Sequence, residues 1–247
     1  LRMGLVFLIL IPFLKLQMPN KKFFKPLVYF SFSMGVMVYV FMNLSLYYSS
    51  IISPIILGSQ LAIPFGILAS AFILKENISK NKWILIFTSF IGITIIFFDP
   101  KLSENFYGLF FASLMALFFG LAQVYSRQLN ILPISLINAS TGIVGFLVLF
   151  VISIFFEGNP FLNIKQINIE SWILISYQAI IVSLCAHLLM FYLYKYYTVG
   201  KIFPFYSLFP IFGIILTYLV FGEVPTVLFI LGGIIVISSV FFIHKIK

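Results

Sequence analysis

The amino-acid sequence predicts an all-α fold, a polytopic membrane helix bundle with nine transmembrane helices. Of its 247 residues, 62% are hydrophobic and only 9% are charged, whereas a soluble domain carries about 25% charged residues. Mean hydropathy is +1.17, and the apolar residues form long runs between short polar segments. So few charges cannot cover the surface of a water-soluble protein of this size. Lipid is therefore expected to surround most of the chain.

The nine helices are assigned from the length of each apolar run. A membrane-spanning helix needs about 20 apolar residues, because each residue adds about 1.5 Å along an axis that must cross about 30 Å of hydrocarbon. The runs are too long and too uniformly apolar for the alternating strands of a β-barrel. The nine expected helices span residues 1–15, 26–48, 50–74, 83–98, 105–126, 133–156, 171–194, 202–221 and 226–243.

The first expected helix is unusually short. Its uninterrupted apolar run, from Met3 to Leu14, has 12 residues and would reach only about 18 Å along a helix axis. A secretory signal peptide would place a small-x-small cleavage site after such a run, and none follows here. We therefore expect residues 1–15 to be part of a helix whose beginning is missing.

The basic residues indicate how the chain is oriented. A net charge of +9 would suggest nucleic-acid binding in a soluble protein, but here the basic residues lie in short clusters between apolar runs. If residues 1–15 run from outside to inside, only Arg2, Lys101 and Lys165 of the 15 Lys and Arg residues lie outside. The positive-inside rule then places the C-terminus in the cytoplasm. We expect a multi-pass protein of the cell inner membrane.

Two parts of the sequence resemble each other and predict an inverted repeat. Pro64 precedes Glu76 by 12 positions, and Pro210 precedes Glu223 by 13. The expected topology puts Glu76 on the inner side and Glu223 on the outer side, as in transporters with inverted repeats. Low-complexity apolar sequence could also produce this match by chance. The expected halves are residues 1–101, with four helices, and 102–247, with five.

Proline, glutamate and glycine recur in register in the two halves. The residues concerned are Pro54, Pro64, Glu76 and Gly92 in the first half, and Pro210, Glu223, Gly232 and Gly233 in the second. This pattern resembles the EamA family of the drug/metabolite transporter superfamily. The resemblance implies ten helices in two inverted halves of five, of which this chain lacks the first. It also implies substrates such as amino acids, nucleotide precursors or drugs, and a substrate path lined by the missing helix and by the helices expected at residues 26–48, 50–74, 105–126, 171–194 and 202–221.

The candidate substrate contacts are polar side chains within the expected helices. They are Tyr39, Asn43, Ser53, Gln60, Gln123, Asn138, Gln178, Ser183, His187 and Tyr206. Gln60 shares a helix face with Pro64, and a proline leaves a backbone carbonyl without its helical partner, which is tolerated where the helix lines a cavity. Each of these side chains could instead form hydrogen bonds between helices.

His187 is the one ionisable side chain deep within an expected helix. Such a group should face the bundle interior or water, so His187 is either a substrate or proton contact or a neutral histidine bonded to a neighbouring helix. The sequence has no HExxH motif, no Gly-rich phosphate loop and no paired acidic residues within a helix. We therefore expect no enzyme, and no metal or cofactor site.

These observations favour a secondary carrier that works by alternating access. Its expected substrate is a small amphipathic or zwitterionic metabolite, such as an amino acid derivative. The expected partners are that substrate and the lipid bilayer, without nucleic acid, and a homodimer stays open. Two alternatives remain: a truncated, non-transporting membrane protein or partner subunit, and an intramembrane lipid-modifying enzyme, for which the sequence lacks a clustered acid/base set.

Overall fold

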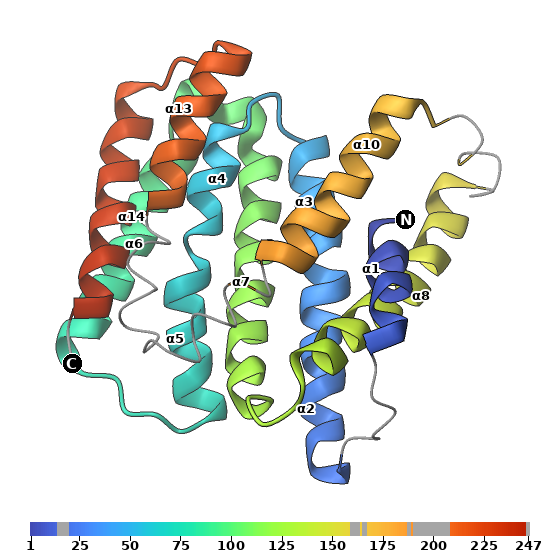
Figure 1. Ribbon diagram of the computed structural model, residues 1–247. Helices are drawn as coiled ribbons and strands as arrows, with labels where there is room; N and C mark the ends of the chain where they lie inside the picture. Colours follow the sequence, from blue (N-terminus) through green and yellow to red (C-terminus); the bar gives the residue numbers. More distant parts are fainter. Residues whose placement is uncertain (14–19, 159–163, 165–166, 187–188, 190–207, 246–247) are drawn as a thin grey trace. The chain divides into compact units, whose positions relative to one another are not determined.

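The computed structural model describes residues 1–13, 20–158, 164, 167–186, 189 and 208–245 (Figure 1). All regular structure within these residues is helical, as predicted for an all-α membrane protein. Five helices are long and apolar enough to cross a membrane, and they comprise residues 21–47, 53–73, 80–97, 106–128 and 134–156. Three shorter apolar helices overlap three further predicted spans, and they comprise residues 169–185, 209–221 and 227–243.

Contacts between residues divide the chain into two compact units. The first unit comprises Leu1–Met37 and Tyr125–Tyr196, and the second comprises Val38–Val124 and Tyr197–Lys247. Each unit therefore contains segments from both halves of the predicted repeat. These contact-based units are compatible with the predicted repeat halves, because helices of inverted copies can pack against each other. The repeat boundary at residue 101 stays a prediction.

In the first unit, the helix at residues 2–10 packs closely against the helix at residues 134–157. Its elements are α1 (Arg2–Leu10), a 3-10 turn (Ile11–Phe13), α2 (Lys21–Phe32), α8 (Ile134–Glu157), α10 (Ile169–Tyr177) and two π-helical stretches, Ser33–Met37 and Gln178–Ala186. A Cβ at Gly142 of α8 would lie 3.0 Å from the backbone nitrogen of Phe7, and a Cβ at Gly4 of α1 would lie 2.9 Å from the ring of Phe146. These contacts make α1 and α8 antiparallel, and the glycines allow the close approach that stabilises helix pairs in membranes.

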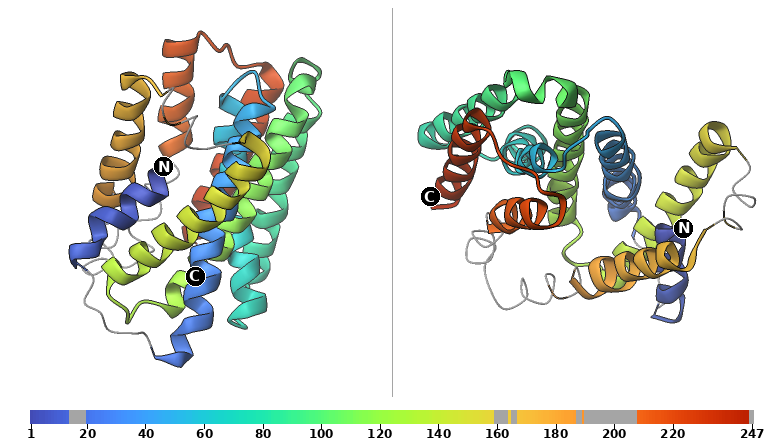
Figure 2. Two further views of the ribbon diagram at one scale, coloured as in Figure 1. Left: turned by 90° about the vertical axis from the view of Figure 1, so that its right-hand side faces the viewer. Right: turned by 90° about the horizontal axis from the view of Figure 1, so that it is seen from above.

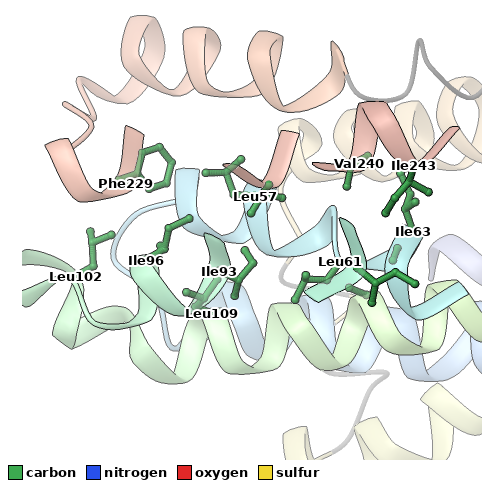
Figure 3. Packing of buried hydrophobic residues seen from close by; sticks show 14 residues of the cluster. Leu57, Leu61, Ile63, Ile93, Ile96, Leu102, Leu109, Phe229, Val240 and Ile243 are labelled. Carbon is green, nitrogen blue, oxygen red and sulfur yellow. The ribbon is translucent and has the colours of Figure 1, made fainter. Parts of the chain in front are cut away.

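The second unit has a core of aliphatic side chains. Its elements are α3 (Val38–Tyr47), α4 (Ser53–Ser59), α5 (Ala62–Ile73), α6 (Lys80–Phe97), a 3-10 segment (Pro100–Asn105), α7 (Phe106–Gln128), α13 (Phe209–Phe221) and α14 (Val227–Lys245). Figure 3 shows the core, in which Leu57, Ile96 and Val240 are fully buried. Because lipid is as apolar as these side chains, close packing rather than removal from water stabilises the contacts between these helices.

Two helix pairs of the second unit run antiparallel. Helices α6 and α14 lie side by side (Figures 1 and 2), and Thr226, just before α14, donates a hydrogen bond to Asp99, just after α6. In the other pair, the hydroxyl of Ser53 at the start of α4 lies 2.8 Å from that of Thr217 near the end of α13. The helices of the two predicted repeat copies therefore run in opposite directions, as predicted for inverted copies.

The helices that carry the repeated prolines, α5 and α13, end with the same backbone conformation. After α5, Lys75 is in the left-handed region with φ 57°, and after α13, Gly222 is in the same region with φ 68°. The backbone N–H of the following residue then donates to the carbonyl six positions earlier, at 3.4 Å for Glu76 and 3.5 Å for Glu223. A left-handed residue just after the last helical turn is a common form of helix C-terminus. The sequence repeat is thus accompanied by a structural one.

The third predicted helix, expected to be continuous, is interrupted near its middle. Helix α4 ends at Ser59, and α5 begins at Ala62. Pro64 has no N–H that could donate to the carbonyl of Gln60, and this carbonyl accepts instead from the backbone N–H of Ile63 at 3.2 Å. The interruption corrects the expectation of one unbroken helix, and it determines where the side chain of Gln60 lies.

The left-handed conformation of Lys75 predicts a stabilising substitution. A residue with a Cβ pays about 1 kcal/mol or more in this region, whereas glycine does not. Lys75→Gly should therefore raise the free energy of unfolding by about 1 kcal/mol over Lys75→Ala, which removes the same charge but keeps the strain. Thermal unfolding of the purified protein in detergent measures this difference. The converse substitution, Gly222→Ala, should lower the melting temperature, and equal melting temperatures for the two Lys75 variants would contradict the prediction.

Candidate functional site

A cavity of about 200 Å³ lies within the second unit, beside the interruption between α4 and α5. Its walls are formed by residues of α3, the end of α4, the interruption, the start of α5, α7 and α13. Three of the residues that line it are polar, namely Ser59, Gln60 and Gln123, and the described lining contains no charged side chain. A mostly apolar cavity with a few polar groups is typical of sites that bind small molecules.

Gln60 is the residue of this cavity that most needs a partner. Its side chain is 3% exposed, and its carbonyl oxygen Oε1 is buried without a hydrogen-bond partner among the described residues. A buried polar atom of this kind is rare in folded proteins and calls for an explanation. By contrast, the hydroxyl of Ser59 donates to the backbone carbonyl of Ile56 at 2.7 Å. The carboxamide of Gln60 is therefore the group that a bound molecule could satisfy.

The structure brings together two of the five predicted site residues that it describes in this unit. Gln60 and Gln123 both line the cavity, from the interruption and from α7 respectively. Tyr39 and Asn43 lie on α3, where Tyr39 is half-buried and Asn43 is exposed, and neither lines the cavity. Ser53 does not line it either. Its hydroxyl forms hydrogen bonds with Thr217 and Glu223.

Ser53 belongs to a hydrogen-bond network around the carboxylate of Glu223. The backbone N–H groups of Ile52 and Ser53 donate to Glu223 at 2.6 and 2.9 Å, and the Ser53 hydroxyl donates to the same carboxylate. The left-handed residue Gly222 ends α13 and so directs the following Glu223 toward the start of α4. A carboxylate at a helix N-terminus pairs N–H groups that have no partner within the helix. We call this set, with Thr217, the Glu223 network.

Three further predicted site residues lie in the first unit, where an arginine joins two of them. The guanidinium of Arg2 donates to the hydroxyl of Ser183 through Nε at 3.0 Å and Nη2 at 2.9 Å, and to Oε1 of Gln178 through Nη1 at 3.3 Å. Both acceptors lie in the π-helical stretch after α10. Asn138 lies on α8, and its Nδ2 is buried without a hydrogen-bond partner among the residues described.

Two predicted site residues, His187 and Tyr206, lie outside the described residues. Their roles as substrate or proton contacts stay predictions from the sequence.

A comparison with models of protein families gives one match. The model of the EamA-like transporter family matches residues 106–244, from the start of α7 to the last turns of α14, which is more than half of the chain. The chain belongs to the EamA-like transporter family. It is therefore a multi-pass membrane transporter of the drug/metabolite transporter superfamily, and such transporters are in general not enzymes. The comparison with curated proteins gives no match.

For this family member, sequence reasoning missed several residues that the structure places at the site or at helix ends. Ser59 and Phe209 line the cavity but were not among the candidates. Arg2 and Glu223 form networks with partners far away in the sequence, at separations of 181 and 170 residues from Ser183 and Ser53 respectively. The repeat carried a usable signal for Glu223, because antiparallel copies bring the end of one helix to the start of its counterpart.

The Glu223 network predicts a loss of stability when its carboxylate is removed. Glu223→Ala leaves the N–H groups of Ile52 and Ser53 without an acceptor and should cost about 1–3 kcal/mol of unfolding free energy. Glu223→Gln keeps an acceptor oxygen, so its loss should be smaller. Thermal unfolding in detergent separates the two variants. Glu104→Ala, at an exposed carboxylate, is the control, and Glu223→Ala unfolding at the same temperature as this control would refute the role of the network.

Proposed function

We propose that this chain is a secondary carrier that moves a small metabolite across the membrane, with its substrate site in the cavity beside the α4–α5 interruption. The observation that carries the proposal is the buried carboxamide oxygen of Gln60, which has no partner among the described residues, at a mostly apolar cavity of a transporter-family chain. A carrier must bind its cargo within the helix bundle, and interrupted helices provide polar groups at that depth. Regular α-helix, by contrast, presents no free backbone group there.

The carrier works by alternating access, with one repeat moving relative to the other so that the substrate site opens to each side in turn. Inverted repeats support such movement, because the two copies can exchange conformations. The antiparallel α4–α13 and α6–α14 pairs and the shared left-handed helix ends support the assignment of inverted copies.

The substrate is a small amphipathic or zwitterionic metabolite, such as an amino acid derivative. The cavity of about 200 Å³ is smaller than the roughly 300–1,000 Å³ of sites for drug-sized ligands. Its uncharged lining argues against a bare inorganic ion, because an ion would lose its water without gaining a charged partner. The cargo moves across the cell inner membrane, with the chain's C-terminus in the cytoplasm, as the distribution of Lys and Arg favours.

A substitution that fills the cavity tests the proposed site. Ala116 is fully buried and lines the cavity, so Ala116→Leu should occupy substrate volume and reduce transport at least tenfold, about 1.4 kcal/mol of lost binding. The matched control is Ala71→Leu on α5, away from the cavity lining, which should transport like the wild type. The measurement is uptake of radiolabelled amino acids, their derivatives and nucleosides by vesicles that contain the purified protein.

Two outcomes of this assay count against the proposal. If vesicles with the wild-type chain take up none of the metabolites faster than protein-free vesicles, the carrier function fails. If Ala116→Leu transports as fast as Ala71→Leu, the carrier function stands but its substrate does not bind in this cavity.

A further inference from the structure

We infer that the cavity selects substrates by a hydrogen-bond donor on an uncharged part of the molecule, and that this donor binds Oε1 of Gln60. The inference rests on the proposed function and specifies its substrate class: an apolar group that carries an N–H or O–H, such as an aromatic N–H, an amide N–H or a hydroxyl. A charged end of the substrate, where there is one, lies outside this cavity.

The first argument is that the side chain of Gln60 lacks a partner while its backbone does not. The backbone N–H donates to the carbonyl of Leu57 at 3.0 Å, and the backbone carbonyl accepts from Ile63 at 3.2 Å. The side-chain oxygen Oε1, in a residue that is 3% exposed, has no partner among the described residues. Oε1 can only accept hydrogen bonds. The group that completes it must therefore be a donor.

The second argument is that the neighbouring polar group of the lining cannot replace such a donor. The hydroxyl proton of Ser59 is used within its own helix, in the bond to Ile56 at 2.7 Å. Ser59 therefore leaves the acceptor of Gln60 unpaired. No described residue, Gln123 included, donates to Oε1 of Gln60, so a molecule inside the cavity is the proposed source of the donor.

The third argument concerns charge. The described lining contains no charged side chain, and much of it is the apolar surface of Met115, Phe119 and Phe209. Moving an ionised group from water into such surroundings is costly unless a partner of opposite charge is present. An apolar group loses nothing there, and a single neutral donor gains the bond to Gln60. The lining therefore favours a neutral donor on an apolar body over an ammonium or carboxylate.

The fourth argument is that water makes the selection stricter. A cavity of about 200 Å³ has room for water molecules, which can bond to polar groups of the lining when no substrate is bound. A substrate that displaces this water without replacing its hydrogen bond loses affinity. Two molecules of equal shape, of which one has the donor and the other does not, should therefore bind differently.

Indole and benzofuran are such a pair, because they differ only in an N–H that is replaced by an oxygen acceptor. We would measure their dissociation constants for the purified full chain in detergent from the rise in melting temperature with ligand concentration. Free ligand concentrations are corrected for partition into empty micelles. Indole should bind about three- to tenfold more tightly than benzofuran, the range expected for one hydrogen bond.

The variants Gln60→Leu and Gln60→Met should bind the two probes with equal affinity. Gln60→Met keeps an unbranched side chain of similar length, so it serves if Gln60→Leu fails to fold. Ser113→Ala removes a hydroxyl of α7 that bonds the carbonyl of Leu109 and does not line the cavity. It should keep the wild-type preference for indole.

Three outcomes would overturn the inference without touching the proposed function, which is judged by transport in vesicles. They are equal binding of the two probes to the wild type, binding of neither probe, and a preference for indole that survives in both Gln60 variants. Failure of all metabolites in the transport assay would instead remove the carrier function itself. A preference for indole that disappears in the Gln60 variants and persists in Ser113→Ala establishes Gln60 as the residue that reads the donor.

Discussion

In hydrocarbon, every backbone N–H and C=O group must find its partner inside the protein, and this constraint explains several features of the described fold. Helices satisfy the constraint along their length, so the apolar runs of the sequence become helices. The constraint is hardest to meet at helix ends and interruptions. It is met there by the left-handed ends of α5 and α13, after which a backbone N–H bonds back to the helix, by the carboxylate of Glu223 at the start of α4, and by the local bond between Ile63 and Gln60.

The interruption of α4 and α5 is the place where this constraint and the proposed transport function meet. In a regular helix the backbone N–H and C=O groups bond to each other, so only side chains can bind a substrate. At Gln60 the backbone pairs locally, while the same residue lines a mostly apolar cavity and its carboxamide oxygen has no partner among the described residues. The interruption beside Pro64 therefore puts an amide side chain at a cavity whose described lining contains no charged residue.

Much of the fold could be predicted because the physical signals are local. An apolar run of the right length specifies a helix, and the spacing of Pro64, Glu76, Pro210 and Glu223 revealed two copies whose helices run in opposite directions. Gln60 and Gln123 were both candidates, and the structure places them at one cavity. The sequence did not predict that the helix stops at Ser59 and resumes at Ala62, because Pro64 alone does not fix on which residue a helix ends.

Features that depend on distant parts of the chain were beyond prediction from the sequence. The π-helical stretches 33–37 and 178–186 add a residue to a turn, and no single residue type marks them. The bonds of Arg2 to Ser183 and of Glu223 to Ser53 join positions more than 150 residues apart. Such pairs depend on how the helices pack, and a single sequence does not predict that packing.

The Glu223 network also restricts how the second unit can change shape. It fastens the beginning of α4 to the end of α13 through several bonds that share one carboxylate, so pulling these two ends apart would sever all of them at once. Rotation about that junction would leave them intact. The start of α4 and the end of α13 are therefore expected to move together.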